Sequence, residues 1–340
     1  MGHIYTSVRA NITVEVMDTK LTTQSNKDAN TGVNANLYVP SDEYSMLVGE
    51  EINLVDLKSS LTVQNAVKVS EFNAKLPNDS LYCHLSDVLL VDDFRIVVAD
   101  FWNSKIKLFG RDTLHLASLN LTGHPWNMAK MTKSNIAVTV PKEKRVLTVQ
   151  VKDGFQIAGE IKTKFECWGI AALNEHLLAI TTARDGHYVL ILTTDGRFIQ
   201  QIRHPDFRAN GFLRPIHVTT DKSRRALYVT YSEGNKLVTF SVPEKETQFS
   251  LDKDMLFVYE NKYLRKPLSV DVDEEGNQYI CCYQGGCVQQ ISYEGLFIKR
   301  LISKKRQKIY PLSITFHDKS RKLILTYGWR DVIEIYEMKD

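Results

Sequence analysis

The segment from Lys299 to Lys308 is the densest basic stretch of the 340-residue chain, with six lysine or arginine side chains and no acidic one. Clustered ammonium and guanidinium groups bind phosphates and carboxylates. The chain as a whole has a formal net charge of +3, which by itself implies no partner. The functional meaning of the basic residues therefore depends on where the fold places them.

Cysteine and histidine side chains could bind a metal, but their spacing argues against such a site. Cys281 and Cys282 are adjacent, and neighbours on a strand point to opposite sides of a sheet, so they cannot share an ordinary zinc site with Cys287. The nine histidines show no ligand spacing, and we assign to loops or to the core His84, His124 and His217. We expect structural cysteines, no metal and no cofactor.

The sequence contains no G-x-S-x-G, Walker or H-E-x-x-H motif. We therefore expect no catalytic residue and predict that the protein is not an enzyme. Five cysteines are an odd number for a disulfide framework, and no secretory leader is recognisable, so we expect a cytoplasmic protein. No apolar run approaches the ~18 residues of a membrane span. Gly2 and Thr6 fit the loose myristoylation pattern, which is a minor alternative.

Short alternating apolar runs separated by polar turns recur along most of the chain. In Arg95 to Phe109, RIVVADFWNSKIKLF, two such runs predict a pair of antiparallel strands. Equivalent strands recur every 40 to 52 residues, starting at Arg95, Asn135, Leu177, Ala226, Gln278 and Lys322. This period suits four strands per unit and is typical of propeller blades. The sequence predicts an all-β fold, a six-bladed β-propeller.

The two ends of the predicted ring differ from the repeats between them. After Val332 to Met338 the last unit has only three strands, and we predict that the single strand around Lys68 to Leu76 supplies the fourth and closes the ring. Residues 1–60 are rich in Asn, Thr, Ser and Asp, a composition that cannot bury enough surface to order itself. We predict a flexible polar segment over 1–60 and the propeller over 61–340.

The first unit resembles a known repeat. In Val98 to Phe109 a strand ending in Ala-Asp, an Asn-containing turn and a basic residue match the core of an NHL repeat at Ala99, Asp100, Asn103, Lys105, Ile106 and Phe109. The other units keep the apolar columns and lose most of the polar signature. The resemblance spans about residues 65–340 and is to the C-terminal propellers of tripartite-motif proteins, which implies an adaptor that binds protein or RNA. No cysteine precedes Cys83, so the zinc modules of that family are not carried over.

In a propeller, the connections between blades and the turns between second and third strands lie on one face. By our alignment, this face holds nearly all the excess positive charge of the repeats. We predict that it binds a partner through Arg203, Arg208, Arg214, Arg265, Lys266, Lys304, Lys305 and Arg306. Aromatic residues are interleaved with them at Phe165, Phe207, Phe212, Tyr263 and Tyr310.

Three interpretations of this basic face stay open. Arginines and lysines suit an acidic or phosphorylated peptide, so we predict docking of a protein partner, without a small-molecule substrate. Single-stranded RNA is the alternative, because cations follow phosphates while aromatic rings stack on bases. The third interpretation is that the lysines are solvated and only confer solubility.

Two features concern the centre of the ring. Trp126 and Trp168 share a column in neighbouring blades near the channel mouth and could line a binding cup, although we favour packing because aliphatic residues fill that column elsewhere. A calcium-dependent propeller hydrolase would need several oxygen ligands converging from the innermost strands. Asp87, Asn127 and Asp271 belong to those strands, but no two acids are neighbours in the ring, so this is a minor alternative.

Overall fold

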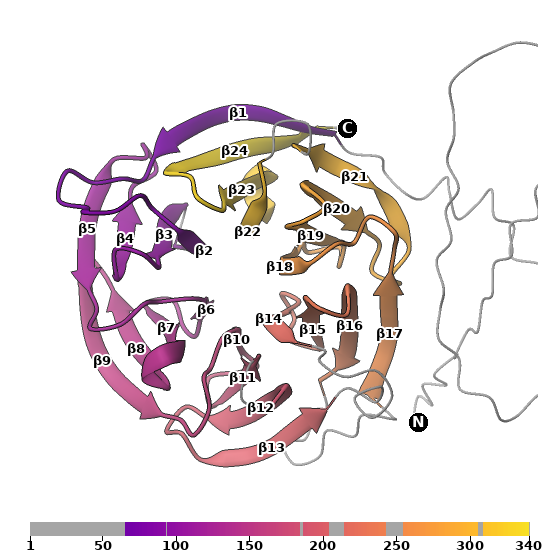
Figure 1. The fold of residues 1–340 in the computed structure, drawn as a ribbon, viewed down its shortest axis with the longest axis horizontal. Coiled ribbons are helices and arrows are strands. Elements are labelled where there is room, and N and C mark those ends of the chain that lie inside the picture. Colours follow the sequence, from indigo (N-terminus) through magenta and orange to yellow (C-terminus); the bar gives the residue numbers. More distant parts are fainter. Residues whose placement is uncertain are drawn as a thin grey trace, which may run out of the picture.

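The computed structural model describes residues 65–92, 94–183, 186–203, 214–242, 254–304 and 309–339. They form six antiparallel sheets of four strands each, arranged as blades in a ring (Figure 1). Residues of all six innermost strands line a cavity at the centre of the ring, called here the channel. The predicted all-β, six-bladed propeller closed by an N-terminal strand is therefore confirmed. The predicted flexible segment, residues 1–60, lies outside the described residues.

Within each blade, the strands follow one another from the channel outward in chain order. The blades are numbered 1 to 6 in the order of their innermost strands, from β2 in blade 1 to β22 in blade 6. The innermost strands are β2 (Leu85–Val91), β6 (Met128–Lys130), β10 (Ile170–Ala172), β14 (Pro215–Thr220), β18 (Pro267–Val272) and β22 (Pro311–His317). The second strands are β3 (Arg95–Asp100), β7 (Asn135–Val140), β11 (Leu177–Thr182), β15 (Ala226–Tyr231), β19 (Gln278–Cys282) and β23 (Lys322–Tyr327). All six second strands begin at the residues that the repeat alignment predicts.

The third strands are β4 (Lys105–Phe109), β8 (Arg145–Val151), β12 (Tyr188–Thr193), β16 (Lys236–Ser241), β20 (Cys287–Ile291) and β24 (Val332–Lys339). The outer strands are β5 (His115–Asn120), β9 (Phe155–Lys162), β13 (Phe198–Arg203), β17 (Met255–Glu260), β21 (Phe297–Ser303) and β1 (Asn65–Asn73). The described residues also include the short 3₁₀ helices η1 (Pro141–Glu143) and η3 (Asp318–Ser320), which lie in turns. No helix in the described residues is both long and apolar enough to cross a membrane.

Strand β1 closes the ring by pairing with the last strand of the chain. It runs antiparallel to β24 from Asn65 opposite Lys339 to Asn73 opposite Val332, with one irregularity between Lys68 and Ser70. Figure 1 shows β1 outside β24, so the sixth blade joins the two ends of the described chain. The closing strand begins three residues before the predicted Lys68, because its extent is set by the length of β24.

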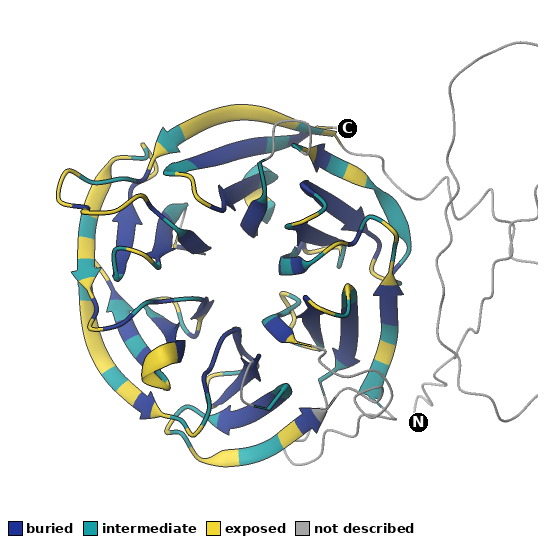
Figure 2. Cartoon of the chain, viewed as in Figure 1, coloured by how far each residue is buried: buried dark blue, intermediate teal, exposed yellow. Residues whose placement is uncertain are grey.

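The core lies between neighbouring blades. The inner strands are almost wholly buried, whereas β1 and the other outer strands expose many residues (Figure 2). Because side chains alternate across a strand, each inner strand contributes to the packing on both of its sides. Cys281 packs in a cluster with blade 6, and its neighbour Cys282 packs in a cluster with blade 4. All five cysteines are buried and unbridged, as expected for structural thiols.

The two faces of the disc carry different loops. One, called here the connection face, carries the connections between blades and the turns between second and third strands. The other, called the turn face, carries the remaining two turns of each blade. The candidate sites below are assigned to one or the other face by these loops.

Candidate functional site

Polar side chains of the innermost strands line the channel. Asp87 accepts hydrogen bonds from the Asn127 amide at 2.9 Å and from the Ser313 hydroxyl at 2.6 Å. Burial raises the pKa of Asp87 to about 7, against the effect of these hydrogen bonds, which favour its charged form. The Ser269 hydroxyl lies 3.5 Å from both the Ser313 hydroxyl and the His217 imidazole. These contacts join adjacent blades.

The second channel acid is also held by donors from a neighbouring blade. Asp271 accepts hydrogen bonds from the Thr315 hydroxyl at 3.1 Å and from the backbone N–H of Phe316 at 2.7 Å. Asp87 and Asp271 thus each face hydrogen-bond donors of another blade. Within the described residues, three or more histidine, cysteine or acidic side chains come together away from the channel, in the first blade.

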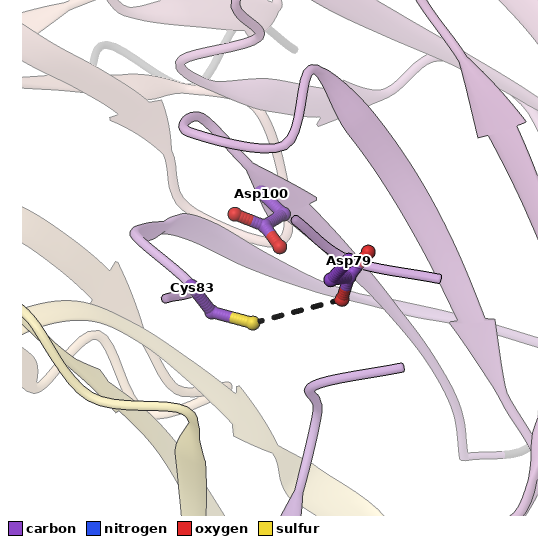
Figure 3. A group of neighbouring side chains, drawn as sticks. All are labelled: Asp79, Cys83 and Asp100. Carbon is purple, nitrogen blue, oxygen red and sulfur yellow. Dashed lines mark hydrogen bonds between the residues drawn. The ribbon is translucent and has the colours of Figure 1, made fainter. Parts of the chain in front are cut away.

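A group of potential metal ligands does occur in the first blade, where Asp79, Cys83 and Asp100 converge (Figure 3). The Lys107 ammonium lies 2.6 Å from a carboxylate oxygen of Asp79, 2.6 Å from one of Asp100 and 3.4 Å from the Cys83 sulfur. Burial alone would lower the pKa of Lys107, but the two carboxylates outweigh it and raise that pKa. The lysine therefore occupies the position that a bound cation would take, and we assign the group to structure.

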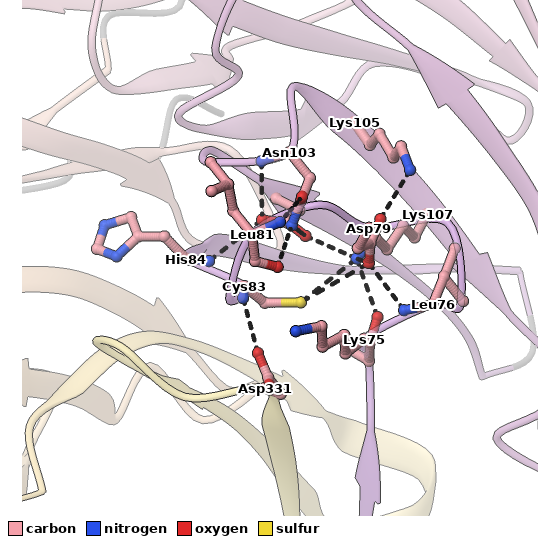
Figure 4. A network of polar contacts seen from close by, with 12 residues as sticks. Lys75, Leu76, Asp79, Leu81, Cys83, His84, Asn103, Lys105, Lys107 and Asp331 are labelled. Carbon is pink, nitrogen blue, oxygen red and sulfur yellow. Dashed lines mark hydrogen bonds and ion pairs between the residues drawn. The ribbon is translucent and has the colours of Figure 1, made fainter.

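This buried ion-pair network fastens the connection between β1 and β2 (Figure 4). Asp79 also pairs with the Lys105 ammonium at 2.7 Å. Asp100 accepts hydrogen bonds from the backbone N–H of His84 at 3.1 Å and from the side-chain amide of Asn103 at 2.8 Å. The polar residues that carry the NHL resemblance, Asp100, Asn103 and Lys105, thus hold residues 74–84 in place. Their observed contacts are structural.

On the connection face, the channel mouth widens into a cavity of ≈ 240 Å³, called here the cup. Its walls are mostly apolar, formed by Trp126, Trp168, Ile216, Leu268, Leu312 and Trp329. The rings of Trp126 and Trp168 meet edge to face, with their centroids 4.9 Å apart. Trp168 is only 6% exposed, so it packs in the core as we favoured and also contributes one edge to the cup.

Trp329 is the most unusual residue of the cup. It lies in the turn between β23 and β24 with φ of +64°, and its side chain is 64% exposed. The left-handed region is costly for a bulky residue, and exposed packing recovers little of that cost. Its ring centroid lies 5.5 Å from that of Trp102 and 5.6 Å from that of His84. The turn therefore presents a tryptophan to the solvent beside an aromatic cluster.

Two cations stand at the rim of the cup. Arg214 lies 3.5 Å from Glu233, and the Lys266 ammonium lies 5.6 Å from the centre of the Tyr283 ring. Tyr283 approaches Gly328 so closely that a Cβ there would lie 2.9 Å from the tyrosine ring. Any side chain at residue 328 would displace Tyr283, so this glycine permits the wall to form.

His84 is the histidine of the cup. Burial lowers the pKa of its imidazole to about 4, although the nearby Asp100 acts in the opposite direction. The ring is therefore neutral at physiological pH. Its Nδ1 atom has no hydrogen-bond partner among the described residues. The sequence alone assigns this histidine to a loop or the core, because the histidines are scattered along the chain without ligand spacing.

The predicted partner-binding residues fall into two groups. Those with described side chains are Arg214, Arg265, Lys266 and Lys304. Arg214 and Lys266 stand at the cup, Arg265 is exposed beside Lys266, and Lys304 lies 3.3 Å from Glu334 in the closing blade. Outside the description lie the side chain of Arg203 and all of Arg208, Lys305 and Arg306.

Two residues of the cup, Trp329 and Tyr283, had no place in the sequence prediction. A signal was present, because both are aromatic residues at the start of turns between second and third strands, on the face predicted to bind. The binding residues of that face were predicted from the charges of its loops, so these two uncharged residues were not considered.

Comparison with known proteins supports the fold without naming a family. No protein-family model matches the sequence, and no curated protein matches it significantly. The structure is similar to virginiamycin B lyase from Staphylococcus aureus, with 11% identity and a TM-score of 0.58 over 79% of this chain and 98% of that chain. It is also similar to a streptogramin B lyase, with 16% identity and a TM-score of 0.56 over 80% of this chain and 87% of that chain.

A third similar structure is the β-propeller domain of Cps50 (Swd1) from Myceliophteria thermophila, with 13% identity and a TM-score of 0.54 over 74% of this chain and 82% of that chain. At such identities the comparisons show the propeller fold alone. None of them confirms the resemblance to NHL repeats or tripartite-motif proteins.

The prediction that the protein is not an enzyme is contradicted by these comparisons, because lyases are among the similar structures. Absence of sequence motifs was a weak ground for that prediction. A propeller site is assembled from single side chains on separate blades, so its residues have no fixed spacing in the chain.

Proposed function

We propose that the connection face binds an acidic segment of a protein partner, with one large apolar or aromatic side chain of that segment in the cup. The observation that carries this proposal is the exposed Trp329 beside a mostly apolar cavity with Arg214 and Lys266 at its rim. Anchors of protein interfaces are typically aromatic or apolar side chains in such pockets, surrounded by a polar rim.

The size of the cup favours a side chain over a whole small molecule. Its volume of ≈ 240 Å³ lies below the ~300–1,000 Å³ of common small-molecule sites. A longer segment could place its anchor in the cup and direct its carboxylates to Lys266, while Arg214 remains shared with Glu233. Because these contacts are partly exposed and electrostatic, affinity should fall as salt rises.

Selection from an immobilised library of acidic peptides tests the proposal. For the selected peptides, we expect Trp329→Ala and Lys266→Glu each to reduce affinity about tenfold or more, since both remove a contact at the cup. Tyr293→Ala is the matched control, because Tyr293 is also 63% exposed but lies on the turn face. Peptides that bind all three variants as tightly as the wild type would contradict the proposal.

RNA binding, implied by the NHL resemblance, is tested by a parallel arm with an oligouridine probe. Stacking on Trp329 and phosphate contacts at Lys266 would give a steep loss of affinity with salt. Tight binding of the probe, lost in Trp329→Ala, with no selected peptide, would favour RNA over the acidic segment.

Catalysis in the cup is a second candidate function, favoured by His84. The pKa of about 4 makes this imidazole a weak base, but its unpartnered nitrogen can accept a hydrogen bond from a bound ligand and so orient it for reaction. A similar structure is that of virginiamycin B lyase with quinupristin, which supplies a first substrate to test. We expect chromatography to show conversion of quinupristin by the wild type and none by His84→Ala. No conversion by the wild type would contradict this activity.

A further inference from the structure

A second cavity opens on the turn face, beside blades 1, 2 and 6. It has a volume of ≈ 590 Å³ and is lined by Asp92, Arg95, Arg111, Lys130, Lys133 and Lys319. Five of these six residues are basic. They come from separate turns or strand ends, so the concentration of charge arises from the fold and not from one basic run.

One acid lines the cavity, against five basic residues. The carboxylate of Asp92 is already paired with Arg95, three residues further on. It accepts hydrogen bonds from Nε of Arg95 at 3.1 Å and from Nη2 of the same side chain. Lys130 and Lys133 are exposed, and neither forms an ion pair with a described residue. Lys222, near the channel mouth on the same face, differs, because Asp318 lies 3.5 Å and Asp271 4.0 Å from its ammonium.

The backbone beside the cavity is held in an unfavourable conformation. Asp92 has φ of +47° and Phe94 has φ of +81°, in the turn between β2 and β3. Positive φ also occurs in other tight turns of this protein, for example at Ser104, Lys144 and Arg321, and it is costly for a bulky residue such as Phe94. The Lys322 ammonium lies 5.4 Å from the centre of the Phe94 ring, so a further cation lies next to this turn.

We propose that this cavity binds a compact anion carrying several phosphate groups, such as an inositol polyphosphate, either free or as the headgroup of a lipid. Several phosphates are proposed because five basic residues line one cavity of ≈ 590 Å³, more charge than a single phosphate carries. Arginine contributes forked donors and lysine contributes point charges, the two usual means of binding phosphate oxygens. The volume of ≈ 590 Å³ lies within the usual range for small-molecule sites.

Titration calorimetry with inositol hexakisphosphate tests the proposal. We expect binding by the wild type and a loss of about 100-fold in Lys130→Glu/Lys133→Glu, since each reversal removes a charge-assisted contact worth about tenfold or more. The control Arg197→Glu/Arg225→Glu makes the same charge change on the turn face, at exposed residues outside the cavity, and should bind like the wild type. Thermal melting of all variants verifies that they are folded.

Two outcomes would overturn the proposal: wild-type affinity for inositol hexakisphosphate no higher than for inorganic phosphate, or unchanged affinity in Lys130→Glu/Lys133→Glu. Cosedimentation with phosphatidylcholine vesicles containing phosphatidylinositol bisphosphate distinguishes a lipid headgroup from a free ligand. Lys266→Glu on the connection face should leave this binding intact. The test is therefore independent of the peptide proposal, and either can fail alone.

Discussion

Lys107 has no solvent exposure, and its ammonium is held between the carboxylates of Asp79 and Asp100. Replacing it by methionine would leave Asp100 without its ion-pair partner and Asp79 with Lys105 alone. Breaking a buried pair in this way costs about 3–5 kcal/mol. We expect Lys107→Met to lower the free energy of unfolding by that amount, measured by urea denaturation.

A matched control for this substitution is Lys142→Met. Lys142 pairs with Glu166 at 2.8 Å, but its side chain is 49% exposed. A solvated pair contributes about 0–1 kcal/mol, so this variant should be close to the wild type. If both variants lose the same small amount, the network in the first blade does not have the structural role assigned to it.

Glu334 gives the closing blade a dependence on pH. Burial would raise its pKa, but hydrogen bonds from Tyr327, Tyr336 and Lys68 outweigh burial and lower the pKa to about 2 from an ordinary value of 4.5. Because the folded state binds this proton less tightly, the stabilisation is complete above about pH 4.5 and is lost as the pH falls toward 2. Urea unfolding between about pH 6 and pH 3 should show this decline.

The variant Glu334→Gln isolates this contribution. It has no carboxylate to protonate, so its stability should fall less steeply with decreasing pH than that of the wild type. Identical slopes for the two proteins over the acidic range would show that Glu334 is not responsible.

The environment of a single residue was predictable from the sequence where it depends only on neighbouring residues in the same strand. The opposite orientations of Cys281 and Cys282 follow from the period of a strand, and the structure places them in different clusters. The role of Lys107 was not predictable, because Asp79 lies in the connection before the first blade and its distance from Lys107 depends on ring closure. From the sequence the cup was only the less favoured interpretation of Trp126 and Trp168, because its other walls come from different blades.

At the scale of strands, the sequence was a good guide to where each strand begins, because alternation and turn residues act locally. It was a poorer guide to charge on the two faces. From the sequence, the charges of all loops on each face were added up, so acidic residues in some turns cancelled basic residues in others. The cavity lined by Arg111, Lys130 and Lys133 was therefore invisible until the turns were placed in space.

Gly169 shows how closely neighbouring blades approach at the channel. A Cβ at this residue would lie 2.7 Å from the His217 Cα and 2.8 Å from the Val218 nitrogen, both backbone atoms of blade 4. Backbone cannot move aside as a flexible side chain can. We expect Gly169→Ala to destabilise the protein by about 1–3 kcal/mol, the usual cost of overpacking, measured by urea denaturation.

Gly159→Ala in the outer strand β9 is the control, because the added Cβ would meet only the Thr148 side chain at an ordinary 3.7 Å. Its stability should equal or slightly exceed that of the wild type, since alanine restricts the unfolded chain. Equal effects of the two substitutions would mean that the contact between blades 3 and 4 is not tight.

At the scale of the whole molecule, closure makes the ring a single cooperative unit. The blades pack side by side, so each depends on two neighbours, and β1 joins the two ends of the described chain by pairing with β24. A chain that begins at residue 75 retains Asp79 and the network of the first blade but lacks β1. It leaves the edge of β24 unpaired and removes Phe72, whose ring lies 5.1 Å from that of Phe109.

We expect this shortened chain to lose the cooperative thermal transition of the full protein, whereas a chain that begins at residue 61 should melt like the full protein. A synthetic peptide of residues 61–76, added in excess, should restore the transition by pairing with β24, because binding to the folded state stabilises it by mass action. An unchanged melting curve for the chain that begins at residue 75 would show that the ring holds without its closing strand. Recovery with a peptide of scrambled sequence would show that the pairing with β24 is not specific.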